Sequence, residues 1–246
     1  MDALAALRLQ VEWGADEALE DAPQDRIRPA PPAAAPAPLR RPAVPSPGIA
    51  AAHAPHPADA CTDLAALAGA IAGFTGCALR ETAANTLWLE GDPTHSILVI
   101  GDPPVAEDDR AGRIFQGSDA ALSLTLLASI GLERGMLALC PLLPWRPPGD
   151  RPASAAELSA CLPFVQRLIA LANPRVLVLA GAQAVKSLGP ERRRMRPEFL
   201  PSPAAGPPVL VLGGMAALRG SPAGKQAAWA ALRALRHHLD GTLAQS

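Results

Sequence analysis

Short runs of apolar residues alternate along the chain with longer stretches in which apolar side chains recur at helical spacing. The runs are continuous enough for strands buried on both faces, and they lie at 97–100, 136–140, 175–180 and 209–212. Helical spacing is found at 64–71, 118–130, 154–171, 182–188 and 222–239. Strands that alternate with helices predict an α/β fold, in which a parallel sheet is covered on both faces by helices.

Residues at the predicted helix ends support this interpretation. Ser118 is a good cap for the helix that follows it, and Gly131 ends that helix. Ser154 and Glu157 form a capping-box pattern at the start of the next helix. The segments 141–152 and 213–221 are predicted to be loops.

The N-terminal part of the chain has a different composition from the rest. Residues 1–22 carry apolar side chains at helical spacing and predict a short amphipathic helix, either a weakly ordered appendage or a docking helix for a protein partner. Residues 23–60 are rich in Pro and Ala and cannot bury enough apolar surface to offset their ordering entropy. We therefore expect a disordered linker there, followed by a folded domain over 61–246.

Composition and charge narrow the class of protein. Apolar residues make up 49% of the chain, enough for a sizeable core, and the net charge of −1 argues against coating nucleic acid through bulk charge. Neither a signal peptide nor a run of about eighteen strongly apolar residues is present, so we expect a soluble, cytoplasmic protein without a membrane span. The four cysteines show no CxxC spacing, which argues against a disulfide framework.

Candidate chemistry begins at the end of the first predicted strand. In open parallel sheets, ligands bind beyond the carboxyl ends of the strands, so Asp102 is the first candidate functional residue. The acidic residues that follow, Glu107, Asp108 and Asp109, are predicted to form a solvated charged turn rather than a metal site.

Four segments carry a family resemblance: 76–93 (GCALRETAANTLWLEGDP), 101–117 (GDPPVAEDDRAGRIFQG), 145–184 (WRPPGDRPASAAELSACLPFVQRLIALANPRVLVLAGAQA) and 217–229 (ALRGSPAGKQAAW). In order and spacing they resemble the motifs of the family 4 uracil-DNA glycosylases, whose first motif is close to GEAPGxxEDxxGRPFVG. The resemblance covers about 64–239. It implies a three-layer α/β/α sandwich with a four-stranded parallel sheet in the order 2-1-3-4, and hydrolysis of the N-glycosidic bond of uracil in DNA.

The resemblance also implies roles for particular residues. Phe115 matches the phenylalanine that stacks on the flipped base, although it could be an ordinary loop anchor under the first strand. Asp102 matches the acid that positions the attacking water or stabilises an oxocarbenium-like sugar, although it could instead cap the following turn. Gly101 and Pro104 of the same motif are expected to contact the base.

Other positions depart from the family pattern. Pro141 stands where the family has an Asn that reads the uracil edge, and proline offers neither a side-chain amide nor a backbone N–H. Gly213 or Gly214 stands where the family has a His that stabilises the departing uracil anion. We therefore expect weakened or altered glycosylase activity.

The iron–sulfur site of the family is also incomplete. Family 4 enzymes hold a four-iron cluster with four cysteines, of which Cys77 and Cys161 match the second and fourth. Phe74 and Trp145 occupy the first and third positions, and the other two cysteines could substitute only after a considerable rearrangement. The sequence predicts neither a cluster nor any other metal.

Contacts to DNA are expected from arginines. Arg192, Arg193, Arg194 and Arg196 form the one concentrated basic run, and Arg219 matches an arginine of the family's DNA-penetrating loop, although a solvated charge run is the alternative. Two functions remain open. The protein is either a DNA base-excision repair glycosylase, expected to be monomeric, or a non-catalytic descendant that binds DNA or a repair partner, for example through the N-terminal helix.

Overall fold

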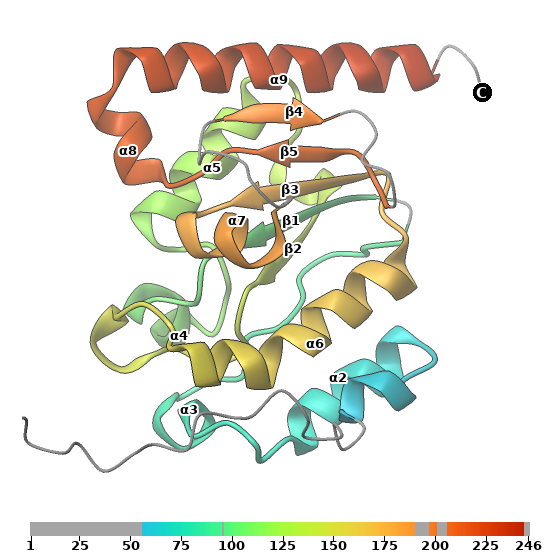
Figure 1. The fold of residues 1–246 in the computed structure, drawn as a ribbon, viewed down its shortest axis with the longest axis vertical. Helices are drawn as coiled ribbons and strands as arrows, with labels where there is room; N and C mark the ends of the chain where they lie inside the picture. The colour runs from blue at the N-terminus through green and yellow to red at the C-terminus, as the bar shows by residue number, and fades with distance from the viewer. Residues whose placement is uncertain (1–55, 95, 190–196, 201–205, 244–246) are drawn as a thin grey trace, which may run out of the picture. The chain divides into compact units, whose positions relative to one another are not determined.

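A twisted sheet built from the predicted apolar runs lies at the centre of the folded domain (Figure 1). The structure is a computed structural model that describes residues 56–94, 96–189, 197–200 and 206–243. The predicted N-terminal helix (1–22) and most of the predicted linker (23–60) lie outside the described residues.

Within the described residues the sheet has five strands in the order β2-β1-β3-β5-β4. The parallel strands are β1 (Ile97–Gly101), β2 (Leu137–Pro141), β3 (Val176–Ala180) and β5 (Val209–Val211). They correspond to the four predicted runs in the predicted order 2-1-3-4, so the α/β/α fold class is confirmed. In this register Gly101 pairs with both Pro141 and Ala180, which brings the carboxyl ends of three strands side by side.

The prediction of a wholly parallel, four-stranded sheet is wrong by one strand. β4 (Glu198–Leu200) pairs antiparallel with β5 at the edge of the sheet. It is only three residues long, and none of the three is fully buried. A strand of this kind has no continuous apolar run, so the pattern that identifies the central strands does not mark it.

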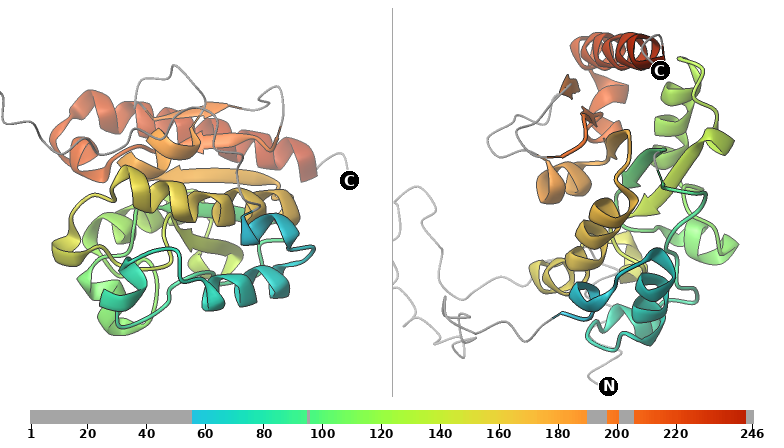
Figure 2. Two further views of the ribbon diagram at one scale, coloured as in Figure 1. Left: turned by 60° about the horizontal axis from the view of Figure 1, so that its bottom comes forward. Right: turned by 90° about the vertical axis from the view of Figure 1, so that its right-hand side faces the viewer.

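Helices cover both faces of the sheet (Figures 1 and 2). Successive residues of a strand point to opposite faces, so each central strand contributes to two hydrophobic cores. One hydrophobic core joins Leu98 and Ile100 of β1 to α2 (Leu64–Gly73), α6 (Ala155–Ala172) and α7 (Ala182–Leu188). The other core joins Ile97 and Val99 to α5 (Ser118–Ala128), α8 (Met215–Gly220) and α9 (Pro222–Leu243). The connections contain α3 (Leu79–Thr82), α4 (Ala106–Ala111) and the 3₁₀ turns η1 (Pro57–Ala60), η2 (Arg134–Met136) and η3 (Pro148–Asp150).

The folded domain begins before the predicted boundary at Cys61. Residues 57–60, assigned by the sequence to the linker, form η1, whose Ala58 is fully buried. The ring of His56 packs edge-on against Phe164 of α6 at a centroid distance of 4.6 Å. Arg167 of α6 donates through Nε to the carbonyl of Cys61 at 2.8 Å. Composition alone placed the boundary too late, since proline and alanine are also compatible with a short 3₁₀ turn.

The segment 213–221, predicted to be a loop, contains α8, which at six residues is too short to show a helical period.

Among the described helices α6 alone has the length and apolar composition of a membrane span. Cys161, Phe164, Val165 and Leu168 of α6 are buried in the protein core.

Candidate active site

A cavity of about 360 Å³ opens at the carboxyl ends of the parallel strands. Gly101, Pro141 and Ala180, the last residues of β1, β2 and β3, line it together. Residues at the N-terminal ends of α4, α5, α7 and α8 complete its wall. The volume is within the range of small-ligand sites, and the position is the one expected for a site in an open parallel sheet.

Asp102 lies in the wall of this cavity and holds the first turn of α7. Its Oδ2 accepts the N–H of Ala182 at 3.0 Å, and its Oδ1 accepts those of Gln183 and Ala184 at 2.8 and 2.9 Å. Gly181, with φ 148°, precedes these donors, and any side chain there would overlap the carboxylate. Capping is therefore one role of Asp102, although it caps α7 rather than the turn that directly follows it.

The electrostatic surroundings of Asp102 act in opposite directions. Burial raises the pKa of its carboxyl group, whereas the three backbone N–H donors oppose that rise. The nearby negative charge of Asp119 raises the pKa further. Oδ2 accepts one described hydrogen bond and Oδ1 accepts two, so Oδ2 keeps a lone pair that can accept a proton or a hydrogen bond from water.

Phe115 lines the cavity in an unusual backbone conformation. It is only 5% exposed, and its φ of 61° lies in the left-handed region, which costs a bulky residue about 1–3 kcal/mol. The ring lies against Gly101, where a Cβ atom would come within 2.8 Å of the ring Cζ. Phe115 thus packs under the end of β1, as the anchor interpretation expects, and it also forms part of the cavity wall.

Other residues of the first motif differ in their position relative to the cavity and to solvent. Gly101 lines the cavity, whereas Pro104 is buried and Pro103 borders the cavity instead. Asp108 and Asp109 are 5% and 7% exposed, so the prediction of a solvated turn is wrong for both. Asp108 accepts the N–H of Val105 at 3.0 Å and caps α4, while Asp109 accepts backbone N–H groups from the segment after α3. Both carboxylates are buried because backbone donors satisfy them.

The described lining of the cavity is acidic and contains no Lys, Arg or His. Its acidic side chains are Asp102, Glu107, Asp108, Asp119 and Asp150. Asp119 forms an ion pair with Arg219, and Asp150 forms one with Arg146 at 2.6 Å. The sequence does not single out Asp119 and Asp150, because one lies inside a predicted helix and the other in a predicted loop. Their position at the cavity depends on the tertiary fold.

Pro141 borders the cavity, as its place at the end of the second strand predicts. Two residues earlier, Leu139 donates its N–H outward to the carbonyl of Glu90 at 2.8 Å, away from β1. A residue at 141 would direct its N–H to the same side, so a proline there removes no hydrogen bond between β1 and β2.

Near the C-terminal end of the sheet, Met215 lines the cavity and is 2% exposed. Gly213 has φ 73°, and Gly214 is the N-cap of α8. The sequence indicated that a polar donor is missing from this loop, but it did not identify Met215 as the residue that borders the cavity. No side chain from 213–215 supplies a hydrogen-bond donor there.

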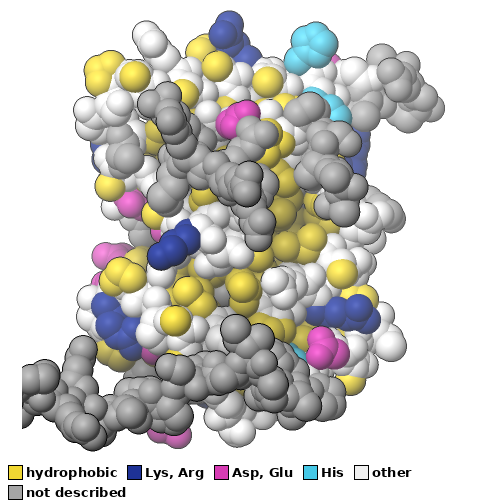
Figure 3. Space-filling model, in the orientation of Figure 1, with side chains coloured by type: hydrophobic (Ala, Val, Ile, Leu, Met, Phe, Trp, Pro, Cys, Tyr) yellow, Lys and Arg dark blue, Asp and Glu magenta, His cyan; other side chains and the backbone are white. Residues whose placement is uncertain are grey.

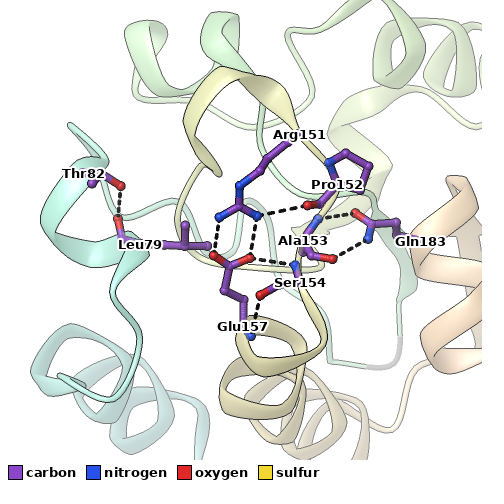
Figure 4. A network of polar contacts seen from close by, with 8 residues as sticks. All are labelled: Leu79, Thr82, Arg151, Pro152, Ala153, Ser154, Glu157 and Gln183. Carbon is purple, nitrogen blue, oxygen red and sulfur yellow. Dashed lines mark hydrogen bonds and ion pairs between the residues drawn. The ribbon is translucent and has the colours of Figure 1, made fainter. Parts of the chain in front are cut away.

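A polar network fixes the loop after β2 to α7 (Figure 4). Arg151 forms two hydrogen bonds with Glu157, at 2.9 and 2.6 Å, and Ser154 completes the capping box of α6. Gln183 of α7 accepts the N–H of Ala153 at 3.0 Å and donates to its carbonyl at 3.2 Å. The neighbouring N–H of Gln183 is bound by Asp102, so the network and the cavity share the first turn of α7.

The predicted DNA-binding arginines are only partly described. Arg192, Arg193, Arg194 and Arg196 lie outside the described residues. Arg219 is exposed, and its guanidinium donates to the carbonyl of Ser118 at 2.9 Å. On the face in Figure 3, the coloured Lys and Arg side chains are scattered rather than gathered into one broad patch.

The residues at the family's cluster positions do not fit a four-iron cluster, which requires four thiolate ligands. Cys77 and Cys161 are buried free thiols, and burial together with the adjacent Cys77 raises the pKa of Cys161. The rings of Phe74 and Trp145 stack with centroids 6.4 Å apart. Among the described residues no three His, Cys, Asp or Glu side chains come together to hold a metal ion.

Comparison with known proteins agrees with the motifs. The model of the uracil DNA glycosylase superfamily matches residues 89–233. A type-4 uracil-DNA glycosylase of Pyrobaculum aerophilum is 30% identical over 126 residues, which cover 51% of this chain and 64% of that protein. The type-4 uracil-DNA glycosylases of Thermotoga maritima (33% over 111 residues, 45% of this chain and 58% of that protein) and Sulfurisphaera tokodaii (31% over 111 residues, 45% and 50%) are also similar. The chain thus spans between half and two thirds of the length of these relatives.

Proposed function

The chain belongs to the uracil-DNA glycosylase superfamily, and on that premise we propose that it acts in DNA base-excision repair. In this proposal it hydrolyses the N-glycosidic bond of a uracil or other damaged base flipped out of DNA into the cavity, with weakened or altered activity. The observation that carries the proposal is that Asp102 and the strained Phe115 lie together in one cavity at the carboxyl edge of the sheet.

Each of these two residues has a task in such a reaction. A flipped base has lost its stacking neighbours, and stacking on an aromatic side chain returns about 1–3 kcal/mol per base. Phe115 offers its ring for this contact. The ionised Asp102 has a lone pair on Oδ2 that orients an attacking water, and its negative charge stabilises an oxocarbenium-like sugar. Because three backbone N–H groups fix the carboxylate, its position is set before the substrate arrives.

The same cavity is poorly suited to releasing uracil. Uracil departs as an anion, and loss of a donor aimed at such a charge costs about 10²–10³ in rate. Pro141 and Met215 border the cavity without a side-chain donor, and the described lining carries five acidic side chains. We therefore expect uracil excision at least about a hundredfold slower than in a family member with the full motifs. A base that leaves as a neutral molecule, such as an N-alkylated purine, avoids this cost.

A second candidate is a non-catalytic role in binding DNA or a repair partner. The observation that favours it is that Asp102 already has a structural task, since it caps α7. For either candidate we further propose a monomeric state, a cytoplasmic location and a repair partner bound through the N-terminal helix. DNA contacts are proposed for Arg192, Arg193, Arg194 and Arg219. The absence of an iron–sulfur cluster is proposed as well.

Excision assays with defined oligonucleotides test the proposal. Purified protein is incubated with single- and double-stranded DNA containing one uracil, one hypoxanthine or one N-alkylated purine, and abasic sites are then cleaved. Release of any of these bases, lost in Asp102→Asn, supports catalysis. DNA binding without release of any base supports the non-catalytic candidate.

A further inference from the structure

A second surface near the cavity combines an exposed tryptophan with basic side chains. We call it the Trp229 groove. It has a volume of about 470 Å³ and is lined by Leu122 and Leu126 of α5, Leu218 and Arg219 of α8, and Lys225 and Trp229 of α9. α8 contacts both α5 and α9 (Figure 1). Residues of all three helices line the groove.

The indole of Trp229 is unusually accessible. Its residue is 47% exposed, and Met136 is the other large apolar residue exposed to a comparable degree in the described parts of the chain. Leu218 beside it is 5% exposed, so the floor of the groove is apolar and firmly packed. An exposed aromatic ring beside apolar side chains offers a flat face on which a nucleic-acid base can stack.

The charge of the rim is positive on the side of α9. Lys225 is exposed and has no ion-pair partner among the residues that the structure describes. Arg219 lies between the groove and the cavity, because it lines the groove while its guanidinium binds the carbonyl of Ser118 and the carboxylate of Asp119. Ser118 and Asp119 both line the cavity, so the two sites share one wall.

We infer that the Trp229 groove binds the single strand of DNA that flanks the nucleotide held in the cavity, an inference that rests on the proposed function. Nucleotides joined to a flipped base have to leave the cavity across its rim. Arg219 lines the groove and binds Ser118 and Asp119 of the cavity wall, so a strand that crosses the rim at this point enters the groove. There the indole stacks on a base of any sequence, Lys225 neutralises a phosphate, and the leucines contact the apolar edges of sugar and base.

Measuring the affinity of the full chain for undamaged single-stranded oligonucleotides tests the inference without requiring catalysis. Loss of one stacked base by Trp229→Ala weakens binding about 5-fold to 150-fold. Trp229→Phe keeps an aromatic face and restores most of the affinity. Lys225→Gln lowers the slope of log affinity against log salt by about 0.7. Met136→Ala is the matched control, since it removes the other exposed large apolar side chain and lies before β2, outside the groove.

Two further readouts separate stacking from a general loss of structure. Bound DNA quenches the tryptophan fluorescence of the wild type, and this quenching is largely lost in Trp229→Phe. The affinity loss in Trp229→Ala is larger for long strands than for a damaged nucleotide with a single neighbour on each side. Equal affinity of wild type and Trp229→Ala for long strands, unchanged quenching in Trp229→Phe, or a loss independent of strand length would overturn the inference.

The result is distinguishable from failure of the proposed function. If no base is excised but binding of long strands depends on Trp229, the catalytic proposal fails and the groove stands. If bases are excised but binding is indifferent to Trp229, the groove fails and the catalytic proposal stands.

Discussion

Replacement of Asp102 separates its role as a helix cap from its proposed role in catalysis. Asp102→Asn retains a side-chain oxygen that can accept the N–H groups of Gln183 and Ala184, but its amide nitrogen would face the N–H of Ala182. Asp102→Ala leaves all three donors without a protein partner. Loss of a cap costs about 0.5–2 kcal/mol, so we expect about 1 kcal/mol for Asn and about 2 kcal/mol for Ala. Neither loss unfolds a domain with a stability of about 5–15 kcal/mol.

Activity should respond differently from stability. Both substitutions remove the negative charge and the proton acceptor, so base release falls about 10²–10⁴-fold in each, although their stabilities differ. Urea unfolding gives the stability change, and single-turnover release from oligonucleotides gives the rate. Asp63→Ala is the matched control, because Asp63 caps α2 through the N–H of Ala66 at 2.7 Å and does not line the cavity. It should cost about 1 kcal/mol and leave base release unchanged.

The pH dependence adds an independent check on Asp102. Burial raises the pKa of its carboxyl group above the ordinary value of 3.8, and the proposed reaction needs the ionised form. Base release should therefore fall on the acid side at a pH above 3.8, while the protein remains folded. Wild-type rates of base release in Asp102→Asn, measured on fully folded protein, would refute the catalytic role and leave Asp102 as a cap alone.

The cavity, the cysteine positions and the capping box of α6 can each be probed separately. The double substitution Pro141→Asn with Gly214→His should raise uracil release at least about tenfold, because each new side chain supplies a hydrogen-bond donor near the cavity. An unchanged rate in single-turnover assays would contradict the roles assigned to these positions. Protein purified anaerobically should contain no stoichiometric iron or sulfide, and four iron atoms per chain would show that the cysteines rearrange. The hydrogen bond from Arg151 lowers the pKa of Glu157 to about 2, so the folded state holds its proton less tightly than the unfolded state. The stability from this pair is then present above pH 4.5 and lost as the pH falls towards 2, and urea midpoints of Glu157→Gln should lack this part of the acid dependence.

The sequence predicts the strands because each central strand is apolar throughout, and a parallel sheet covered on both faces requires that pattern. It also places the cavity correctly, since the ends of parallel strands meet at one edge. β4 has no such pattern, because an edge strand of three residues is partly exposed. The left-handed conformation of Phe115 could not be predicted either, because no local propensity favours it and only the surrounding packing holds it.

Residues such as Asp150 and Met215 show why the cavity lining was predicted only in part. They lie far from the first motif in the sequence, and the fold alone brings them to its edge. The three contacts of Asp102 illustrate the same limit. A lone acid after a strand has the same local pattern whether it activates water or caps a distant helix, and only the position of α7 shows that it does the second.

The proposed absence of a cluster leaves the aromatic core to hold together the segments that carry Phe74, Trp145 and Cys161. A cluster that ties separate segments together contributes to folding, so a fold without one needs other contacts at the same place. Phe74 and Trp145 stack on each other, Phe74 meets Phe164 edge-on at 5.1 Å, and His56 packs against both phenylalanines. These rings join the segment before η1, the C-terminal end of α2, the loop after β2 and the middle of α6. Apolar packing of this kind needs no ligand, so the ends of the sheet that shape the cavity can stay in place without iron.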